Sequence, residues 1–230
     1  MIKILLIAAA TMIVATSCTQ PGRWPNGKIP YMLVGFSEEE QATIVASMWL
    51  WEQSTGVNFK NVMFEKNDED AHVLFILKGD KDSEIDGMST CGYNEDKIHM
   101  SIISNVTQQI VIHEMGHVLG LTHEHQRPDR DSHILINWSN MISDASVKAQ
   151  FLINEPKYYD YKRYKYDFYS CMHYKNKAGS RSDQLNTIES PVPVGIYDVP
   201  SRRDIQKVRE IQGTDNSLKG KLRDLGKDSE

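Results

Sequence analysis

The 230-residue sequence has no cluster of basic residues and no internal repeat. Lysine and arginine total 26 against 31 aspartate and glutamate residues, which gives a formal net charge of −5. Proteins that bind nucleic acid or an anionic membrane surface through charge carry clustered lysine and arginine. The sequence therefore argues against a nucleic-acid partner.

The hydrophobic run near the N-terminus is too short to cross a bilayer as a helix. It extends over Ile4–Val14, follows Lys3 and is succeeded by small residues. A positive start, a short apolar stretch and small residues together are typical of an export signal. We therefore expect residues 1–17 to be a signal peptide and the protein to be exported.

Cysteine is scarce, and the first of the three cysteines follows this signal directly, after Ala15-Thr16-Ser17. Ordinary signal peptidase could cut before Cys18, or Cys18 could become the lipid-modified residue of a lipoprotein. Because a cysteine at this point is uncommon by chance, we favour a lipid anchor at Cys18 in a membrane of the bacterial cell envelope, with secretion as the alternative. Cys91 and Cys171 then remain; an exported chain could pair them, but two buried free thiols are favoured.

The most informative stretch is residues 113–123, which read HEMGHVLGLTH. In a helix, His113 and His117 lie one turn apart on the same face. Gly120 can adopt the left-handed conformation that ends a helix, so that the chain turns back and brings His123 to the same point. Three imidazoles with an open fourth position are typical of catalytic zinc, so we expect one Zn²⁺ per chain.

Glu114 follows the first of these histidines and carries a carboxylate towards the open position. A carboxylate there can act as the general base for a water molecule that attacks a carbonyl group. The short HExxH pattern occurs by chance, whereas the full HExxHxxGxxH pattern together with a downstream Met-turn is far more specific. Residues 170–174, SCMHY, provide that turn.

These motifs resemble those of the astacin family of zinc endopeptidases. The similarity continues in residues 124–131 (EHQRPDRD), in residues 24–31 (WPNGKIPY) and in the predicted helix around Asp204. By this resemblance Glu114 would be the general base, Tyr174 would be an additional, displaceable ligand that later binds the oxyanion, and Met172 would lie beneath the site. The zinc ligands that the resemblance implies are His113, His117 and His123.

The resemblance also implies a structural role for Glu124. In the family, the residue after the third histidine pairs with the amino terminus of the mature chain once an inhibitory segment has been removed. Only residues 18–23 separate the expected signal peptide from Trp24, which is short for such a segment. The partner of Glu124 and the control of latency are therefore left open.

The sequence predicts an endopeptidase that acts on protein or peptide substrates. The competing hypothesis is a catalytically silent, lipid-anchored binding protein that keeps the zinc-peptidase scaffold. Glu114 argues against it, because a scaffold needs the metal ligands but not the base.

The predicted fold is α+β, of the two-lobed metzincin or zincin-like type, in a monomer. We expect an N-terminal lobe with a mixed sheet and two helices, an irregular C-terminal lobe with one helix, and the active-site cleft between them. Residues 18–23 would be a short tether, residues 24–213 the catalytic domain and residues 214–230 a polar, flexible tail.

Local patterns predict the individual elements. Strands are expected over residues 29–34, 58–64 and 72–77, and helices between Ser37 and Gly56, around residues 108–119 and after Ser201. The first helix is expected to bury Ala42, Val45, Met48 and Trp49, and the second to be capped by Asn105 or Gln108.

Residues 97–102 alternate between polar and apolar side chains, which indicates a half-buried or edge strand. An extended substrate could add to such an edge as a further strand, through main-chain hydrogen bonds that do not depend on its sequence.

Overall fold

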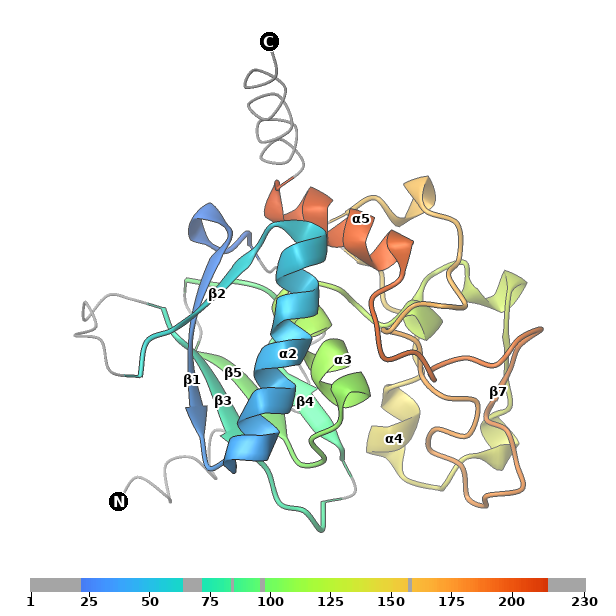
Figure 1. Cartoon of the computed structure of the whole chain (residues 1–230). Coiled ribbons are helices and arrows are strands. Elements are labelled where there is room, and N and C mark those ends of the chain that lie inside the picture. Colours follow the sequence, from blue (N-terminus) through green and yellow to red (C-terminus); the bar gives the residue numbers. More distant parts are fainter. Residues whose placement is uncertain (1–21, 64–71, 84, 96–97, 157–158, 215–230) are drawn as a thin grey trace.

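The computed structural model of the chain describes residues 22–63, 72–83, 85–95, 98–156 and 159–214 (Figure 1). The predicted signal peptide, Cys18 and residues 215–230 of the predicted tail lie outside the described residues. Thr214 belongs to the packed part of the chain, because it is buried. No helix in the described ranges is both long enough and apolar enough to cross a membrane.

The N-terminal lobe is built on a five-stranded mixed sheet with the strand order β2-β1-β3-β5-β4. The four strands β2, β1, β3 and β5 run parallel, and β4 is antiparallel to β5. Parallel neighbours need a crossover connection, which helix α2 provides between β1 and β2. The strand bounds are β1 (Lys28–Val34), β2 (Asn58–Asn61), β3 (Leu74–Lys78), β4 (Gly87–Ser89) and β5 (His99–Ile103).

The sheet ends in β2 on one side and in β4 on the other, so of the expected half-buried or edge strand at residues 97–102 the edge position is wrong. Strand β5 lies between β3 and β4, and all of its residues but one are buried. Strand β4 has only three residues, Gly-Met-Ser, without alternating hydrophobicity, and is defined by main-chain pairing such as that of Met88 with Ile102. A tertiary pairing of this kind leaves no periodic signal in the sequence.

Helix α2 (Glu38–Thr55) begins and ends as predicted but buries a different face. Ser37 and Glu40 form the capping box, and Gly56 ends the helix in the left-handed conformation. Of the four residues expected to be buried, Met48 is buried, but Ala42, Val45 and Trp49 are exposed. The other buried residues of the helix are Ile44, Ser47, Trp51 and Thr55. The helix carries apolar side chains on all of its faces, so their periodicity alone does not indicate which face is buried. The buried face is the one that contacts α3, where the Trp51 indole donates to the carbonyl oxygen of Ile112 at 3.1 Å.

Helix α3 (Gln108–Val118) lies beside α2 (Figure 1) and is buried along most of its length, as its apolar composition predicts. Its N-cap is Thr107, whose hydroxyl accepts from the N–H of Ile110. The expected caps were wrong: the side chain of Asn105 donates to Asp86 instead, and Gln108 is the first helical residue.

The C-terminal end of α3 turns back sharply at Gly120. This residue has a φ of 98°, which only glycine adopts at low cost. Its N–H donates to the carbonyl of His117, and the N–H of Leu121 donates to that of Gly116. These two bonds form a Schellman motif, and they direct the following residues back along the helix.

The C-terminal lobe is irregular, as predicted, and has its own small core. This core contains Ile134, Ile136, Met141, Phe151, Tyr166, Ile188 and Val194. A two-stranded ribbon pairs β6 (Leu135–Ile136) with β7 (Ile188–Glu189). The helices are α4 (Ala145–Ala149), α5 (Arg202–Gln212) and the short 3₁₀ turns η2 (Glu124–Gln126), η3 (Arg130–Ser132), η4 (Trp138–Asn140) and η5 (Tyr161–Arg163), while η1 (Pro25–Gly27) precedes β1.

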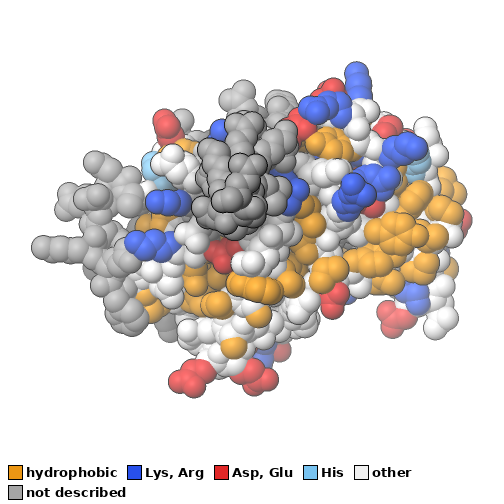
Figure 2. All heavy atoms as spheres, turned by 45° about the horizontal axis from the view of Figure 1, so that its top comes forward, with side chains coloured by type: hydrophobic (Ala, Val, Ile, Leu, Met, Phe, Trp, Pro, Cys, Tyr) orange, Lys and Arg blue, Asp and Glu red, His pale blue; other side chains and the backbone are white. Residues whose placement is uncertain are grey.

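Helix α5 joins the two lobes. It follows the C-terminal lobe in sequence but contacts α2 (Figure 1), where Arg209 donates to the carbonyl of Ser54 at 2.6 Å. It begins after Ser201, as predicted, and Ser201 and Asp204 form a capping box at its N-terminus. Figure 2 shows basic and acidic side chains interspersed over the face on which α5 lies, with hydrophobic side chains gathered over the C-terminal lobe.

Candidate active site

Three histidine rings converge where α3 ends and the chain turns back. His123 Nε2 lies 3.2 Å from His113 Nε2 and 3.1 Å from His117 Nε2. Among the described residues, these histidines are the one group of three or more potential metal-binding side chains whose ligand atoms all lie within 4.8 Å of one another. The structure therefore brings together the three residues that the sequence singled out.

The other nitrogen of each ring is held by a hydrogen-bond acceptor. Nδ1 of His113 lies 2.7 Å from the carbonyl oxygen of Cys171, and Nδ1 of His117 lies 2.9 Å from that of Leu121. Nδ1 of His123 lies 2.9 Å from the side-chain oxygen of Gln126. Because an oxygen of this kind only accepts, each Nδ1 carries the hydrogen, and each Nε2 keeps its lone pair.

Three lone pairs that point at one another repel unless a cation lies among them. Nitrogens bound tetrahedrally to zinc at its usual bond length lie about 3.3 Å apart, close to the spacing found here. Burial lowers the pKa of all three rings, to about 3 for His117, and so keeps them in the neutral form that binds metal. The donor set therefore fits Zn²⁺.

Glu114 lies in a buried position on the same helix. Its Oε2 atom has no hydrogen-bond partner, which is unusual for a buried carboxylate. Burial raises the pKa of Glu114 to about 8; a hydrogen bond from the Ser89 side chain opposes this shift, and the charge of Asp86 adds to it. A dication nearby would oppose that shift by stabilising the carboxylate. An unpaired, buried acceptor beside a metal-binding cluster is suited to bind a water molecule or a proton.

Gly87 makes the position of Glu114 possible. A Cβ atom on Gly87 would come within 2.7 Å of Glu114 Oε1, so any other residue would displace one of the two. Because Gly87 begins the edge strand β4, the carboxylate lies directly at the edge of the sheet. Sequence reasoning missed this glycine, since nothing in the local pattern distinguishes it from a turn residue.

The Met-turn lies against α3 from the other side. Met172 is buried, and its side chain packs against Gly116, which lies between His113 and His117 in the sequence. Because Gly116 has no side chain, the Met172 sulfur fits against the helix there. Cys171 is a free, buried cysteine. It therefore does not pair with Cys91, and the expectation of two free thiols is wrong for Cys91, which is disulfide-bonded. The carbonyl of Cys171, not its thiol, supports the site by orienting His113.

Tyr174 stands at the end of the Met-turn beside the histidines. Its ring centroid is 4.5 Å from that of His123, and it stacks on His125 at 4.1 Å. Burial raises the pKa of the Tyr174 hydroxyl, and Glu114 contributes in the same direction. The phenol is therefore held against the metal-binding cluster as a neutral hydrogen-bond donor.

Comparison with known proteins agrees with this geometry. The family model described as Astacin (Peptidase family M12A) matches residues 17–212. The chain belongs to the astacin family.

Relatives within the astacin family are similar over most of this chain. It is 37% identical over 175 residues to Bone morphogenetic protein 1 of Xenopus laevis, a match that covers 75% of this chain and 23% of that protein. It is 30% identical over 196 residues to Zinc metalloproteinase dpy-31 of Caenorhabditis elegans, covering 82% of this chain and 32% of that protein. The chain thus spans roughly a quarter to a third of the length of these relatives.

Solved structures agree with the fold. High choriolytic enzyme 1, a hatching enzyme zinc-protease from Oryzias latipes, is 27% identical and superimposes with a TM-score of 0.68, over 86% of this chain and 97% of that one. The structure of myroilysin is similar in fold, with a TM-score of 0.58, 21% identity and coverage of 83% and 95%. The metal of the family is zinc.

Glu124, which follows His123, has partners that the sequence left open. Its Oε2 atom accepts from the ammonium group of Lys207 at 2.7 Å, and its Oε1 atom from Arg127 at 3.1 Å. Nothing near Lys207 in the sequence points to this contact, because the two residues are 83 positions apart.

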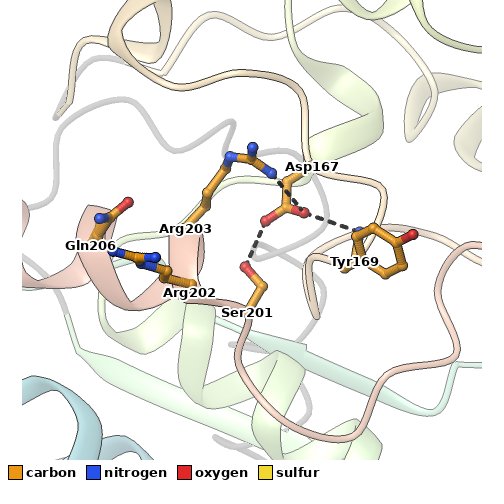
Figure 3. Close-up of a pocket in the computed structure, with 6 residues that line it drawn as sticks. All are labelled: Asp167, Tyr169, Ser201, Arg202, Arg203 and Gln206. Carbon is orange, nitrogen blue, oxygen red and sulfur yellow. Dashed lines mark hydrogen bonds and ion pairs between the residues drawn. The ribbon is translucent and has the colours of Figure 1, made fainter.

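Asp167 connects Glu124 with the start of α5. Its main-chain N–H donates to Glu124 Oε1 at 2.8 Å. Its carboxylate accepts from Ser201 at 2.6 Å and pairs with Arg203 at 3.5 Å (Figure 3). A pocket of about 400 Å³ lies beside these groups, and none of the three histidines lines it. Its lining residues are Asp167, Tyr169, Ser201, Arg202, Arg203 and Gln206.

Proposed function

We propose that this chain is a zinc-dependent endopeptidase that hydrolyses peptide bonds in protein or peptide substrates. The observation that carries the proposal is the convergence of three Nε2 lone pairs beside a buried carboxylate oxygen with no partner. His113, His117 and His123 would hold the metal, and Glu114 and Tyr174 would act on the substrate.

Zinc held by three imidazoles supplies a Lewis acid and an acidic water molecule near neutral pH. Glu114 would accept the proton of the attacking water at its unpaired Oε2 atom and pass it to the leaving amine. Tyr174, a neutral donor beside His123, would hydrogen-bond the developing oxyanion. No side chain forms a covalent bond with the substrate in this mechanism.

Strand β4 is the proposed binding edge for the substrate, in place of residues 97–102. It is the terminal strand of the sheet next to α3, and it begins at Gly87 against Glu114. An extended peptide that adds to this edge would therefore pass the proposed base. Peptides N-methylated at single positions test the idea, because losing a strand-like hydrogen bond should lower kcat/KM at alternate positions only.

Digestion of casein by the zinc-loaded full chain tests the function. We expect internal cleavage that stops when a zinc chelator is added. Glu114→Gln, which keeps shape but cannot accept the proton, should retain zinc and lose about 100-fold or more in rate. Wild-type turnover by the zinc-loaded variant would contradict the mechanism. Absence of cleavage by wild type across casein and gelatin would favour the silent binding protein.

Export and anchoring are proposed from the sequence. The signal-like residues 1–17 support export, and Cys18 directly after them supports a lipid anchor in a bacterial envelope. The alternative to a lipid anchor at Cys18 is a disulfide with Cys91, because Cys91 is disulfide-bonded while Cys171 is free. The two fates exclude each other, because a sulfur that carries a lipid thioether cannot form a disulfide.

Mass spectrometry of the non-reduced protein from a bacterial host decides between them. A diacylglycerol-modified Cys18 peptide and detergent-phase partitioning that Cys18→Ser abolishes would support the anchor. A peptide that links Cys18 to Cys91 would rule it out and leave secretion. Residues 24–213 are proposed as the catalytic domain, with 18–23 as the tether.

A further inference from the structure

Both carboxylate oxygens of Glu124 are occupied from within the chain. Oε1 accepts from Arg127 at 3.1 Å and from the N–H of Asp167 at 2.8 Å, and Oε2 accepts from Lys207 at 2.7 Å. Glu124 is 0% exposed. A further ammonium group, such as a chain terminus, would have to enter this buried space and share Oε2 with Lys207, because Oε1 already accepts two hydrogen bonds.

Lys207 is charged despite its burial. It is 1% exposed, and its ammonium group lies over the rings of Tyr159 and Tyr164. Burial alone would lower the pKa of Lys207, but the attraction of Glu124, with help from Tyr159 and Asp204, outweighs burial and raises it. A buried ion pair often adds no stability over a well-packed apolar pair, so its value here lies in where it holds Glu124.

Glu124 connects this ion pair to the metal ligand His123. The two residues are adjacent in the chain, and the N–H of Glu124 donates to the carbonyl of Met172 at 3.0 Å. Movement of the Glu124 side chain would therefore shift the backbone on which His123 is mounted, together with the Met-turn below it.

A second buried side chain of α5, that of Asp204, supports the metal ligand His113 through the Met-turn. Asp204 lies one turn before Lys207, on the same face of the helix. Its carboxylate accepts from the hydroxyl of Ser170 at 2.7 Å and from the N–H of Cys171 at 3.0 Å. The carbonyl of Cys171 in turn orients His113 at 2.7 Å. One face of α5 thus contacts the supports of two of the three histidines.

We propose that Lys207 is a positioning residue for the metal centre, and that Lys207 and Arg127 together supply from within the chain the positive charge that pairs with Glu124. The centre then assembles when α5 docks, independently of a free amino terminus. This inference rests on the proposed zinc function.

Zinc affinity of the full chain, measured by competition with a chromogenic chelator, tests the role of Lys207. Lys207→Met keeps the aliphatic stem and removes the charge, and we expect it to lower zinc affinity about 10- to 100-fold. Arg202→Met is the matched control, because it removes one positive charge from an exposed position of the same helix. Its zinc affinity should equal that of wild type.

Replacing zinc with Co²⁺ adds a measurement of ligand geometry that does not depend on the overall stability of the protein. The visible absorption of Co²⁺ reports ligand geometry, so Lys207→Met should show an altered spectrum well below its melting temperature. A wild-type spectrum together with wild-type zinc affinity in Lys207→Met would overturn the inference. If that variant does not fold, Glu124→Gln/Lys207→Met replaces it, since removal of both charges leaves no unpaired one. Wild-type zinc affinity in the double variant would equally overturn the inference.

The amino terminus is tested separately with the wild-type chain. Chains with a free and with an acetylated amino terminus should bind zinc equally. Weaker binding by the acetylated chain would show that a terminus, and not Lys207, completes the centre. Neither assay needs cleavage of a substrate, so failure of the proposed peptidase activity would be seen independently.

Discussion

Gly87 lies so close to Glu114 that a Cβ atom on Gly87 would come within 2.7 Å of Glu114 Oε1 and 2.8 Å of its Cγ. Gly87→Ala must therefore move either the edge strand or the carboxylate. A displacement near 1 Å of a catalytic group can cost about 100-fold in rate. We expect kcat to fall by about that factor in casein or peptide cleavage.

Zinc affinity separates this effect from a damaged metal site. The three atoms nearest to a Cβ on Gly87 all belong to Glu114, so Gly87→Ala should bind zinc as wild type does. Gly22→Ala is the matched control, because a Cβ there would make only an ordinary contact of 3.4 Å with Tyr93. Unchanged turnover in Gly87→Ala would show that the contact with Glu114 has no catalytic consequence.

Gly116 and Met172 form the second close contact of the site. A methyl group on Gly116 would overlap the sulfur of Met172, which is 1% exposed and has little room to move. Gly116→Ala should therefore destabilise the protein by about 1–3 kcal/mol, measured by urea unfolding. Met172→Leu, which nearly conserves volume, should cost less than about 1.5 kcal/mol. A smaller loss for Gly116→Ala than for Met172→Leu would contradict the packing argument.

His99 predicts a pH dependence of stability away from the metal centre. It is 1% exposed among Trp24, His72 and Tyr93, and burial, with help from His72, lowers its pKa to about 4. The unfolded chain has a histidine pKa near 6.5 and binds the proton first, so stability is lost as pH falls from about 6.5 to about 4. The shift corresponds to at most about 3 kcal/mol.

His99→Phe isolates this contribution, because it keeps an aromatic ring among the same neighbours and removes the titrating group. Unfolding of metal-free protein by urea should give a shallower dependence on pH for His99→Phe than for wild type between pH 4 and 6.5. Groups that do not contact His99 are present in both proteins, so their contribution cancels in the difference. Parallel curves would show that His99 does not titrate as expected.

Removal of zinc should destabilise the protein as well as inactivate it. A ligand that binds only the folded state stabilises it by about 4 kcal/mol at a thousand times its dissociation constant. We expect a chelator to lower Tm and to abolish cleavage, and stoichiometric zinc to restore both. His123→Ala should remove the zinc-dependent part of Tm, and a zinc-induced increase equal to that of wild type would exclude His123 as a ligand.

The helix ends were predictable because they depend on neighbouring residues. The capping boxes at Ser37 and Ser201 and the positive φ of Gly56, Gly120 and Gly213 follow from side chains and conformations within a few positions. The buried face of α2 was not predictable in the same way. Val45 and Trp49 are as apolar as the residues that are buried, and the position of α3 decides between them.

The sequence by itself determined which residues could gather at the metal centre, because their spacing on one helix and across one turn brings the three histidines together. Only the tertiary structure decided what surrounds them. The edge strand at Gly87 depends on main-chain pairing with β5, and the pairing of Glu124 with Lys207 joins residues 83 positions apart. The first contact forms when β4 pairs with β5 and the second when α5 docks against the rest of the chain, and no local period or motif encodes either.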